Sequence, residues 1–319
     1  MARHVVVGKG PVGSATAQLL AAAGHEVLVL SRSGGRSTGQ LEHRAVDATD
    51  AGALTTAAAG AAAVYNAVNP AYHRWATDWP PVAEALLTAA ERSGAVLVTM
   101  GNLYGYGRPT GPMTPRSPLA ATDTKGRVRV RMWREALAAH EAGRVRVTEA
   151  RASDFVGPQV PATHSHLMRQ LSTVRAGRRS WVIGDPDAPR SWSYLPDVAA
   201  TLVTLGTDQR AWGRAWHVPS SPPRTQREAL GDLAGAMGRT PGPVSAVPWP
   251  ALRAVGLAVP FAAELVAVRH QWDGEFVLDW SETTATFGLT ATPWSDVMAA
   301  SIGGAPGRPR LTPSPDALA

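Results

Sequence analysis

The 319-residue sequence contains no cysteine, and this excludes disulfide bonds, thiolate metal ligands and cysteine nucleophiles. It contains no apolar run long enough to cross a membrane, and it begins on a strand-like pattern with no signal peptide, so we expect a cytoplasmic protein without a membrane partner. The 31 Lys and Arg residues outnumber the 25 Asp and Glu residues, but the net charge of +6 is spread along the chain. We therefore expect no nucleic-acid partner, whereas an anionic ligand is compatible with the charge.

Several sites of known chemistry are also absent. Without a G-x-S-x-G segment the chain lacks the nucleophile elbow of serine hydrolases, and without a Walker A motif phosphoryl transfer is not expected. His164 and His166 lie two residues apart with no third candidate ligand nearby, so we expect no metal site. Lysine is scarce, since only Lys9 and Lys125 occur, and this makes both of them candidates for a function.

The sequence does contain a regular alternation of strand and helix patterns up to Ala150. Short apolar, β-branched runs predict strands, and Ala-rich stretches bounded by Gly and Pro predict helices. The predicted strands are 4–8, 26–30, 62–68, 95–100 and 145–149, and the predicted helices are 15–23, 51–59, 81–92 and 127–142. This alternation predicts an α/β fold with a Rossmann-type, doubly wound parallel sheet.

The second half of the chain is less regular and richer in Pro and Trp. Its patterns predict helices at 164–176, 195–205 and 224–237 and a strand at 181–183. Thr225 is expected to cap the helix at 224–237.

This change of pattern suggests a domain organisation. We expect residues 1–153 to form the nucleotide-binding domain, with a later segment of about 185–220 returning to it. Residues 154–302 are expected to form mainly a smaller C-terminal substrate-binding region. The tail, 303–319, is rich in Pro, Gly and Arg and is expected to be disordered.

A glycine-rich turn joins the first predicted strand to the first predicted helix. It reads as a G-x-G-x-x-G string, which is Gly8-Lys9-Gly10-Pro11-Val12-Gly13. Gly8 permits the tight turn, Gly10 lets the backbone approach a pyrophosphate, and Gly13 lets the helix pack closely on the strand. The helix N-terminus offers free N–H groups to the phosphates. We therefore expect a dinucleotide cofactor, the alternative being a glycine-rich loop without a ligand.

The end of the second strand selects between NAD(H) and NADP(H). It reads Ser31-Arg32-Ser33, with Arg36 beyond, and has no carboxylate to bind the ribose hydroxyls of NAD. Because a guanidinium suits a phosphate, we predict NADP(H), with Arg32 as the main 2′-phosphate ligand and Ser31, Ser33 and Arg36 as helpers. A solvated basic turn is the alternative.

Asp47 and Ala48 follow a short predicted strand. The Asp47 carboxylate could accept a hydrogen bond from the adenine amino group, or it could cap a helix. Asn66 and Ala67 at the end of the third strand, and Thr99 near the end of the fourth, are also expected to contact the cofactor, because ligands bind at the carboxyl ends of parallel strands.

Further polar residues near these strand ends are catalytic candidates. Tyr104 could donate a proton to a substrate carbonyl with Asn102 as an auxiliary donor, or Tyr104 could simply pack there. His73 could titrate near neutral pH in a polar pocket wall, unless its loop is only structural and anchored by Trp75. Lys125 could hold the ribose or act as an acid, or it could be a surface lysine.

Asp154, at the exit of the fifth strand, could orient a cation or a hydroxyl, or cap a turn.

Together with the glycine turn, three later segments resemble the extended and atypical short-chain dehydrogenase/reductases, the NAD(P)-dependent epimerase/dehydratase superfamily. These segments run from Arg151 to Pro158, from Gly184 to Ala199 and from Asp279 to Gly288. The resemblance covers roughly residues 4–300 and implies a Rossmann domain, a small C-terminal substrate domain and an active site between them.

The chain departs from this family at the catalytic residues. The resemblance implies Ser or Thr, Tyr and Lys, the last two as Y-x-x-x-K, but none of the five tyrosines is followed four places on by Lys. Alignment on Glu135 places Arg127 and Arg131 at the Tyr and Lys positions. The proton relay is therefore absent or built from other residues.

Three functions are compatible with these observations. We predict an NADPH-dependent oxidoreductase, either a ketone, aldehyde or enone reductase or an epimerase/dehydratase, acting on a small oxygenated metabolite such as one of secondary metabolism. The first alternative is a non-redox isomerase, lyase or cyclase with NADP(H) bound, and the second is an NADP(H)-sensing regulatory protein. A helix pair on one face of the sheet could also form a homodimer.

Overall fold

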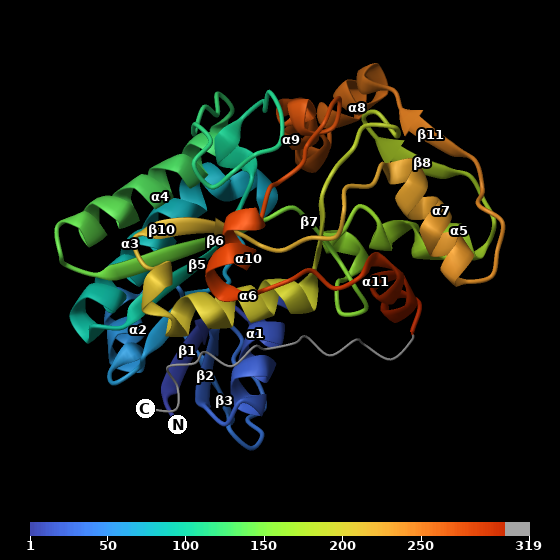
Figure 1. The fold of residues 1–319 in the computed structure, drawn as a ribbon. Coiled ribbons are helices and arrows are strands. Elements are labelled where there is room, and N and C mark those ends of the chain that lie inside the picture. Colours follow the sequence, from blue (N-terminus) through green and yellow to red (C-terminus); the bar gives the residue numbers. More distant parts are fainter. Residues whose placement is uncertain (304–319) are drawn as a thin grey trace.

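The computed structural model describes residues 1–303 and has a seven-stranded parallel sheet at its centre (Figure 1). The strand order is β10-β6-β5-β4-β1-β2-β3. The strands are β1 (Arg3–Val7), β2 (Glu26–Ser31), β3 (Leu41–Ala45), β4 (Ala63–Asn66), β5 (Val96–Asn102), β6 (Arg146–Ala152) and β10 (Arg214–His217). This sheet confirms the predicted α/β fold, and its order reverses between β1 and β4, where such folds bind ligands.

Helices cover both faces of the sheet (Figure 1). One face carries α1 (Pro11–Ala22) and α6 (Leu195–Thr207), and the other carries α2 (Ala51–Ala58), α3 (Trp75–Ser93) and α4 (Thr124–Glu141). Alternate side chains of each strand point into the two hydrophobic cores, one on each face of the sheet, since successive residues of a strand point to opposite faces. A continuously apolar strand such as β1 is therefore buried on both sides.

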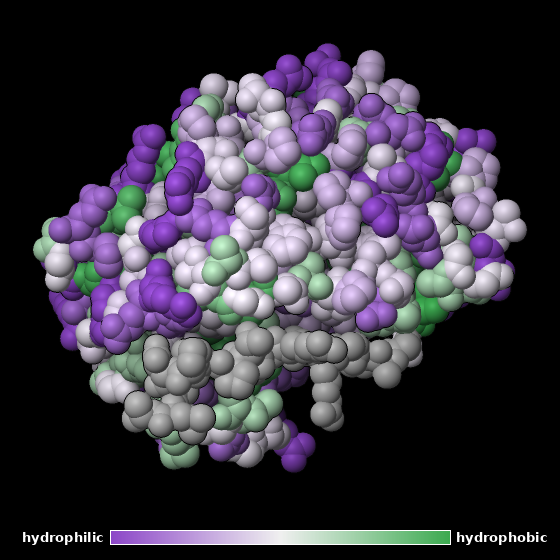
Figure 2. Space-filling view, in the orientation of Figure 1, coloured by the Kyte–Doolittle hydropathy of each residue, from purple (hydrophilic) through white to green (hydrophobic). Residues whose placement is uncertain are grey.

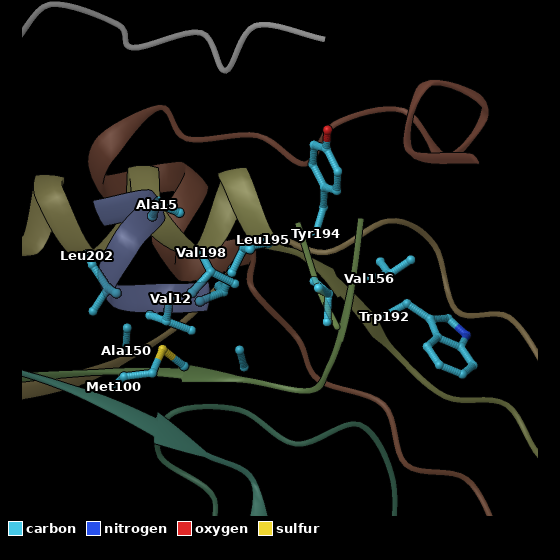
Figure 3. Packing of buried hydrophobic residues seen from close by; sticks show 14 of the residues in the cluster. Val12, Ala15, Met100, Ala150, Val156, Trp192, Tyr194, Leu195, Val198 and Leu202 are labelled. Carbon is cyan, nitrogen blue, oxygen red and sulfur yellow. The ribbon is translucent and has the colours of Figure 1, made fainter. Parts of the chain in front are cut away.

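Figure 3 shows the core beneath α1 and α6. Val12 of α1 and Val198 and Leu202 of α6 lie over Met100 and Ala150 of the sheet, and all five are buried. This packing fixes the N-terminal end of α1 relative to the strand ends. It thereby positions the glycine turn that precedes α1.

The C-terminal half adds a smaller layer beside the sheet (Figure 1). Two strand pairs form there, β7 (Asp154–Val156) with β9 (Trp192–Tyr194) and β8 (Ser180–Ile183) with β11 (Val244–Val247). Its helices are α5 (Leu171–Arg175), α7 (Gln226–Ala236), α8 (Trp249–Gly256), α9 (Pro260–Ala267) and α11 (Trp294–Ser301), whereas α10 (Ser281–Phe287) packs against β10 of the central sheet. The predicted cap of α7 is confirmed, because the Thr225 side chain accepts a hydrogen bond from the Glu228 N–H.

Several predicted helix boundaries are wrong. The helix expected over 164–176 is broken into short turns and α5, because Ser165 is extended and its Oγ accepts a hydrogen bond from the Met168 N–H, which begins a new turn. Helix α3 begins at Trp75 rather than at residue 81. Helix α4 begins at Thr124, where the Asp123 side chain accepts a hydrogen bond from the Gly126 N–H.

No helix within residues 1–303 combines the length and hydropathy that a membrane span needs. Figure 2 shows hydrophilic and weakly hydrophobic residues intermixed over one face of the molecule, with small apolar areas between them. The predicted tail lies, from residue 304 onward, outside the described residues.

Candidate functional site

The glycine turn has the geometry of a phosphate cradle. Gly8 has a φ of +110°, and a Cβ there would lie 2.5 Å from the Ala67 carbonyl oxygen, so only glycine fits. A Cβ on Gly13 would lie 1.9 Å from the Gly8 oxygen. At Gly10, by contrast, no described heavy atom lies within 4 Å of a Cβ, and no side chain caps α1, which starts at Pro11. The helix N-terminus therefore faces open space that fits a pyrophosphate.

A basic turn follows β2 beside this cradle. Arg32, Ser33 and Arg36 are exposed, while the Ser31 hydroxyl donates a hydrogen bond to the Gly34 carbonyl oxygen at 3.2 Å. Lys9 Nζ donates to the same Gly34 oxygen at 2.7 Å.

Lys9 therefore ties the glycine turn to the basic turn and adds a third cation next to Arg32 and Arg36. Sequence reasoning singled Lys9 out only for its rarity. Its place inside the fingerprint was the available signal for a cofactor role.

Asp47 lies on the turn between β3 and α2. Its carboxylate accepts hydrogen bonds from the Thr49 N–H at 2.9 Å and the Thr49 hydroxyl at 2.8 Å. These bonds, with a smaller contribution from the Arg32 charge, hold the pKa of Asp47 below its usual range. Helix α2 is capped by Asp50, so the interpretation of Asp47 as a helix cap is wrong. Ala48 packs at the edge of the core beneath α2 and α3.

A cavity of about 400 Å³ opens at the carboxyl ends of β4 and β5. It brings together four of the predicted site residues, which are Val12, Ala67, Asn102 and Tyr104. Asn66 and Thr99 do not line it. They line a second cavity, of about 570 Å³, between α3 and α4. His73 is exposed and lines neither cavity, so the structure does not bring it together with the catalytic candidates Asn102 and Tyr104.

Two tyrosines meet in the cavity at the strand ends. The Tyr72 hydroxyl donates a hydrogen bond to the Tyr104 hydroxyl at 3.1 Å. Burial raises the pKa of Tyr104 to about 12, although the hydrogen bond from Tyr72 acts in the opposite direction. Tyr104 is therefore protonated at neutral pH and, because Tyr72 supplies one hydrogen bond to its oxygen, its own proton is free for an acceptor in the cavity. Sequence reasoning placed Tyr72 in a pocket wall but gave it no role.

Asn102 contacts Tyr104, and Lys125 contacts Tyr72. The Asn102 Oδ1 accepts a hydrogen bond from the Tyr104 backbone N–H at 3.1 Å, which leaves the Asn102 amide N–H groups as donors. Lys125 is buried, forms an ion pair with Glu264 of α9, and places Nζ 4.2 Å from the centre of the Tyr72 ring. The alternative of a surface lysine is therefore wrong, and Lys125 acts on the cavity through Tyr72.

The two residues that the alignment on Glu135 puts at the Tyr and Lys positions, Arg127 and Arg131, do not line the cavity at the carboxyl ends of β4 and β5. Arg127 and Arg131 are exposed, and Arg131 pairs with Glu135 on the outer face. The inward face carries Lys125 and Arg129, which have the same four-residue spacing.

Arg129 lines the cavity at its β5 side. Its guanidinium lies 4.7 Å from the Trp75 ring centre and 4.3 Å from the Trp79 ring centre, and one nitrogen donates to the Met100 carbonyl oxygen at 3.2 Å. Arg129 Nε is buried without a hydrogen-bond partner in the described residues. Arg129 is thus a buried cation with a donor to spare, which suits a cofactor hydroxyl or a substrate oxygen.

The opposite wall of the cavity comes from the C-terminal half. Asp154 of β7 forms an ion pair with Arg190, whose guanidinium lies 3.9 Å from the Trp272 ring centre. Of the alternatives for Asp154, the structure therefore shows the orientation of a cation. Residues 1–303 contain no group of three or more His, Asp and Glu side chains placed to hold a metal ion.

Comparisons with known proteins agree with this architecture. A family model, described as the NAD dependent epimerase/dehydratase family, matches residues 5–218. A comparison with curated proteins gives no match.

Three solved structures illustrate the likeness of the fold. A dTDP-glucose 4,6-dehydratase from Bacillus anthracis in complex with NAD is 14% identical, with a TM-score of 0.77 over 95% of this chain and 96% of that one. MoeE5 in complex with UDP-glucose and NAD is 18% identical, with a TM-score of 0.74 over 94% and 97%. A putative epimerase from Burkholderia cenocepacia is 22% identical, with a TM-score of 0.74 over 94% and 97%. With the family model spanning the glycine turn and the whole central sheet, the chain belongs to the NAD-dependent epimerase/dehydratase family.

Proposed function

We propose that the protein is an NADP(H)-dependent oxidoreductase that reduces the carbonyl group of a small oxygenated metabolite, with Tyr104 as the proton donor. The observation that carries the proposal is the shared cavity, in which Tyr104 faces the same space as Val12 of the cofactor turn. The neighbouring structures contain NAD, whereas this chain has Arg32 and no carboxylate at the end of β2. This difference supports NADP(H).

The chain's own residues supply the protonation step. When bound, the cofactor supplies a hydride for the carbonyl carbon. Tyr104 gives its hydroxyl proton to the carbonyl oxygen, which becomes the alcohol of the product. The phenolate left on Tyr104 is stabilised by the hydrogen bond from Tyr72 and by the charges of Arg129 and Arg190, whereas the Asp154 charge acts against it. A solvent proton then restores the hydroxyl.

Lys125 and Arg129 have the same four-residue spacing as the expected Y-x-x-x-K pair, and both are buried, but their residue types differ from that pair. Arg129 would hold an oxygen of the cofactor or substrate with its unpaired Nε. Lys125, 4.2 Å from the Tyr72 ring centre, keeps that ring in the geometry from which it donates to Tyr104. Neither residue is the acid that takes the place of the family's tyrosine, and we assign the role of proton donor to Tyr104.

The test is hydride transfer from labelled cofactor. The protein, loaded with NADPH carrying deuterium at C4 of the nicotinamide, is incubated with a panel of ketones, aldehydes and enones. The proposal expects deuterium in a product and a fall in nicotinamide absorbance, both lost in Tyr104→Phe.

Turnover of a substrate without deuterium transfer would support the non-redox isomerase or lyase instead. The absence of any turnover, together with NADPH-dependent capture of a protein partner, would support the regulatory protein.

A homodimer through α3 and α4 is also part of the proposal. The second cavity, of about 570 Å³, lies open between these helices, with Leu87 on one side and Ala136 on the other. A second copy would bury this groove. Light scattering on the purified protein is expected to give twice the monomer mass, and Leu87→Arg is expected to give the monomer. A wild-type monomer would contradict the dimer.

A further inference from the structure

The wall of the cavity that comes from the C-terminal half combines aromatic and aliphatic residues with polar and charged ones. Its apolar residues come from α9 and from the segment that follows it, and they are Phe261, Leu265, Trp272 and Phe276. Phe276 and Leu265 are buried, and Phe261 contacts the Tyr72 ring at 5.7 Å between centres. A ligand that reaches from Tyr104 to this wall therefore passes through apolar surroundings.

One cation on this wall, Arg169, forms no ion pair with a carboxylate of residues 1–303, although the Asp154 charge acts on it. Arg190 is already paired with Asp154 and stacked on Trp272. Arg169 also lines the cavity and is half-buried, but no carboxylate of residues 1–303 lies within ion-pair distance of its guanidinium. Its Nε donates to the Ser165 carbonyl oxygen at 3.2 Å, which orients the group and leaves its terminal nitrogens free for another acceptor.

Two histidines, His164 and His166, also line this wall, and His166 carries no charge that would compete for an anion. Burial lowers the pKa of His166 to about 4, so its imidazole is neutral at pH 7. It lies against the Trp272 ring, with 4.2 Å between the centres. The guanidinium groups of Arg169 and Arg190 therefore share one carboxylate, Asp154, which leaves a positive charge on this wall for an anion.

The size of the cavity limits what can reach Arg169. Its volume of about 400 Å³ lies toward the lower end of ordinary ligand pockets, which range from about 300 to 1,000 Å³. Val12, Ala67 and Met100 line the same space, so the nicotinamide end of the cofactor must share it. The enclosed part of the cavity is therefore matched in size by a compact substrate.

We infer that the substrate is a compact carbonyl compound with an apolar or aromatic body and a carboxylate that binds Arg169. This inference rests on the proposed function for the carbonyl end, at Tyr104. The carboxylate end stands on separate residues and can be tested without turnover. The relatives' UDP-glucose and dTDP-glucose are larger and carry their anionic groups as a diphosphate, so the two substrate classes are experimentally distinct.

The experiment measures binding to the full-length protein by calorimetry, with and without NADP⁺. The probes are phenylglyoxylate, benzoylacetate and 3-benzoylpropanoate, which increase the spacing between carbonyl and carboxylate. Each is compared with the phenyl ketone in which a methyl group replaces the carboxylate. UDP-glucose is the competing probe. The variants are Arg169→Gln, Arg169→Lys and, as a matched control on the exposed side of α5, Arg175→Gln.

We expect one oxo acid to bind more tightly than its neutral counterpart by about tenfold or more, as for a charge-assisted hydrogen bond. Arg169→Gln should remove that difference, Arg169→Lys should restore part of it, and Arg175→Gln should preserve it. Thermal melting of each variant shows that it is folded.

The inference is overturned if no oxo acid binds, if the carboxylate gives no advantage, if Arg169→Gln leaves the advantage intact, or if UDP-glucose binds more tightly than every oxo acid. Oxo-acid binding without deuterium transfer from the cofactor would instead overturn the proposed function alone.

Discussion

The hydroxyl of Tyr72 donates a hydrogen bond to the hydroxyl of Tyr104 over 3.1 Å, although the two residues are 32 positions apart in the chain. Tyr72 follows β4 and Tyr104 follows β5, which are neighbouring strands of one parallel sheet. The carboxyl ends of such strands meet at one edge of the sheet, so the fold itself assembles the pair. In the proposed reaction Tyr104 is the proton donor and Tyr72 stabilises its conjugate base.

Substitution of the two tyrosines should separate these roles. Tyr104→Phe removes the proton donor and is expected to lower kcat by about 100-fold or more, while the Kd for NADPH stays the same. Tyr72→Phe removes only the hydrogen bond to Tyr104 and is expected to lower kcat about tenfold with little change in KM. Steady-state kinetics with the best substrate of the panel checks both. Equal losses in the two variants, or a change in KM alone, would contradict the assignment.

The glycines of the first turn should differ in what they support. Gly10→Ala adds a Cβ in open space, so the folded state should be retained while the Kd for NADPH rises by about tenfold or more, because the methyl group occupies the phosphate cradle. Gly13→Ala places a Cβ 1.9 Å from the Gly8 oxygen and should destabilise the fold itself. Urea unfolding and NADPH titration of both variants measure the difference. A stable Gly13→Ala protein would show that the turn can rearrange.

The ion pair between Lys125 and Glu264 links α4 to α9. The Lys125 side chain is 3% exposed and the Glu264 side chain 28% exposed, so Glu264→Gln leaves a buried ammonium without its counter-charge. We expect a loss of about 1–3 kcal/mol in the free energy of unfolding, below the value for a fully buried pair. Glu275→Gln, at an exposed glutamate, is the control. Equal stability of the two variants in urea would mean that the pair does not anchor α9.

Stability should also depend on pH through His4, a fully buried residue of β1. Burial, and to a lesser degree the neighbouring His25, lower the pKa of His4 to about 4. Between that value and the ordinary value of 6.5 the unfolded chain binds more protons at this position than the folded protein does, so stability falls as the pH is lowered.

When the pH is lowered from 7 to 5, the free energy of unfolding of His4→Leu is therefore expected to fall by about 1–2 kcal/mol less than that of the wild type. No described residue hydrogen-bonds the His4 imidazole, so the substitution removes no hydrogen bond. The control is His73→Gln, at an exposed histidine. Parallel pH profiles for His4→Leu and the wild type, measured by urea unfolding, would refute this account.

Much of the fold could be predicted because its signals are local. The apolar run of β1, the glycines that follow it and the Ala-rich α1 lie within one short stretch of sequence. Contacts between residues that are distant in the sequence were harder to predict. The break in the helix expected over 164–176 is itself a local signal that the prediction missed, because the Ser165 hydroxyl accepts a hydrogen bond from the Met168 N–H three residues on.

The candidate site was predictable where it followed from strand ends and not where it depended on helix rotation. Tyr104 and Asn102 follow β5 directly, and both line the cavity. Lys125 and Arg129, in contrast, are buried because of how α4 rotates on the sheet, whereas the alignment on Glu135 pointed to Arg127 and Arg131, which are exposed. Contacts with Glu264 and Trp272 come from the irregular C-terminal half, where the sequence predicted the return of about 185–220 but gave no pattern for the residues that line the cavity from α9 onward.

The central claim is that a guanidinium just after β2 selects NADP(H), and it is tested most directly by titrating NADPH and NADH into the wild type and Arg32→Ala. The account predicts that the wild type binds NADPH at least about tenfold more tightly than NADH, and that Arg32→Ala removes this preference by weakening NADPH alone. Equal or tighter binding of NADH by the wild type, or an unchanged Kd for NADPH in Arg32→Ala, would contradict it.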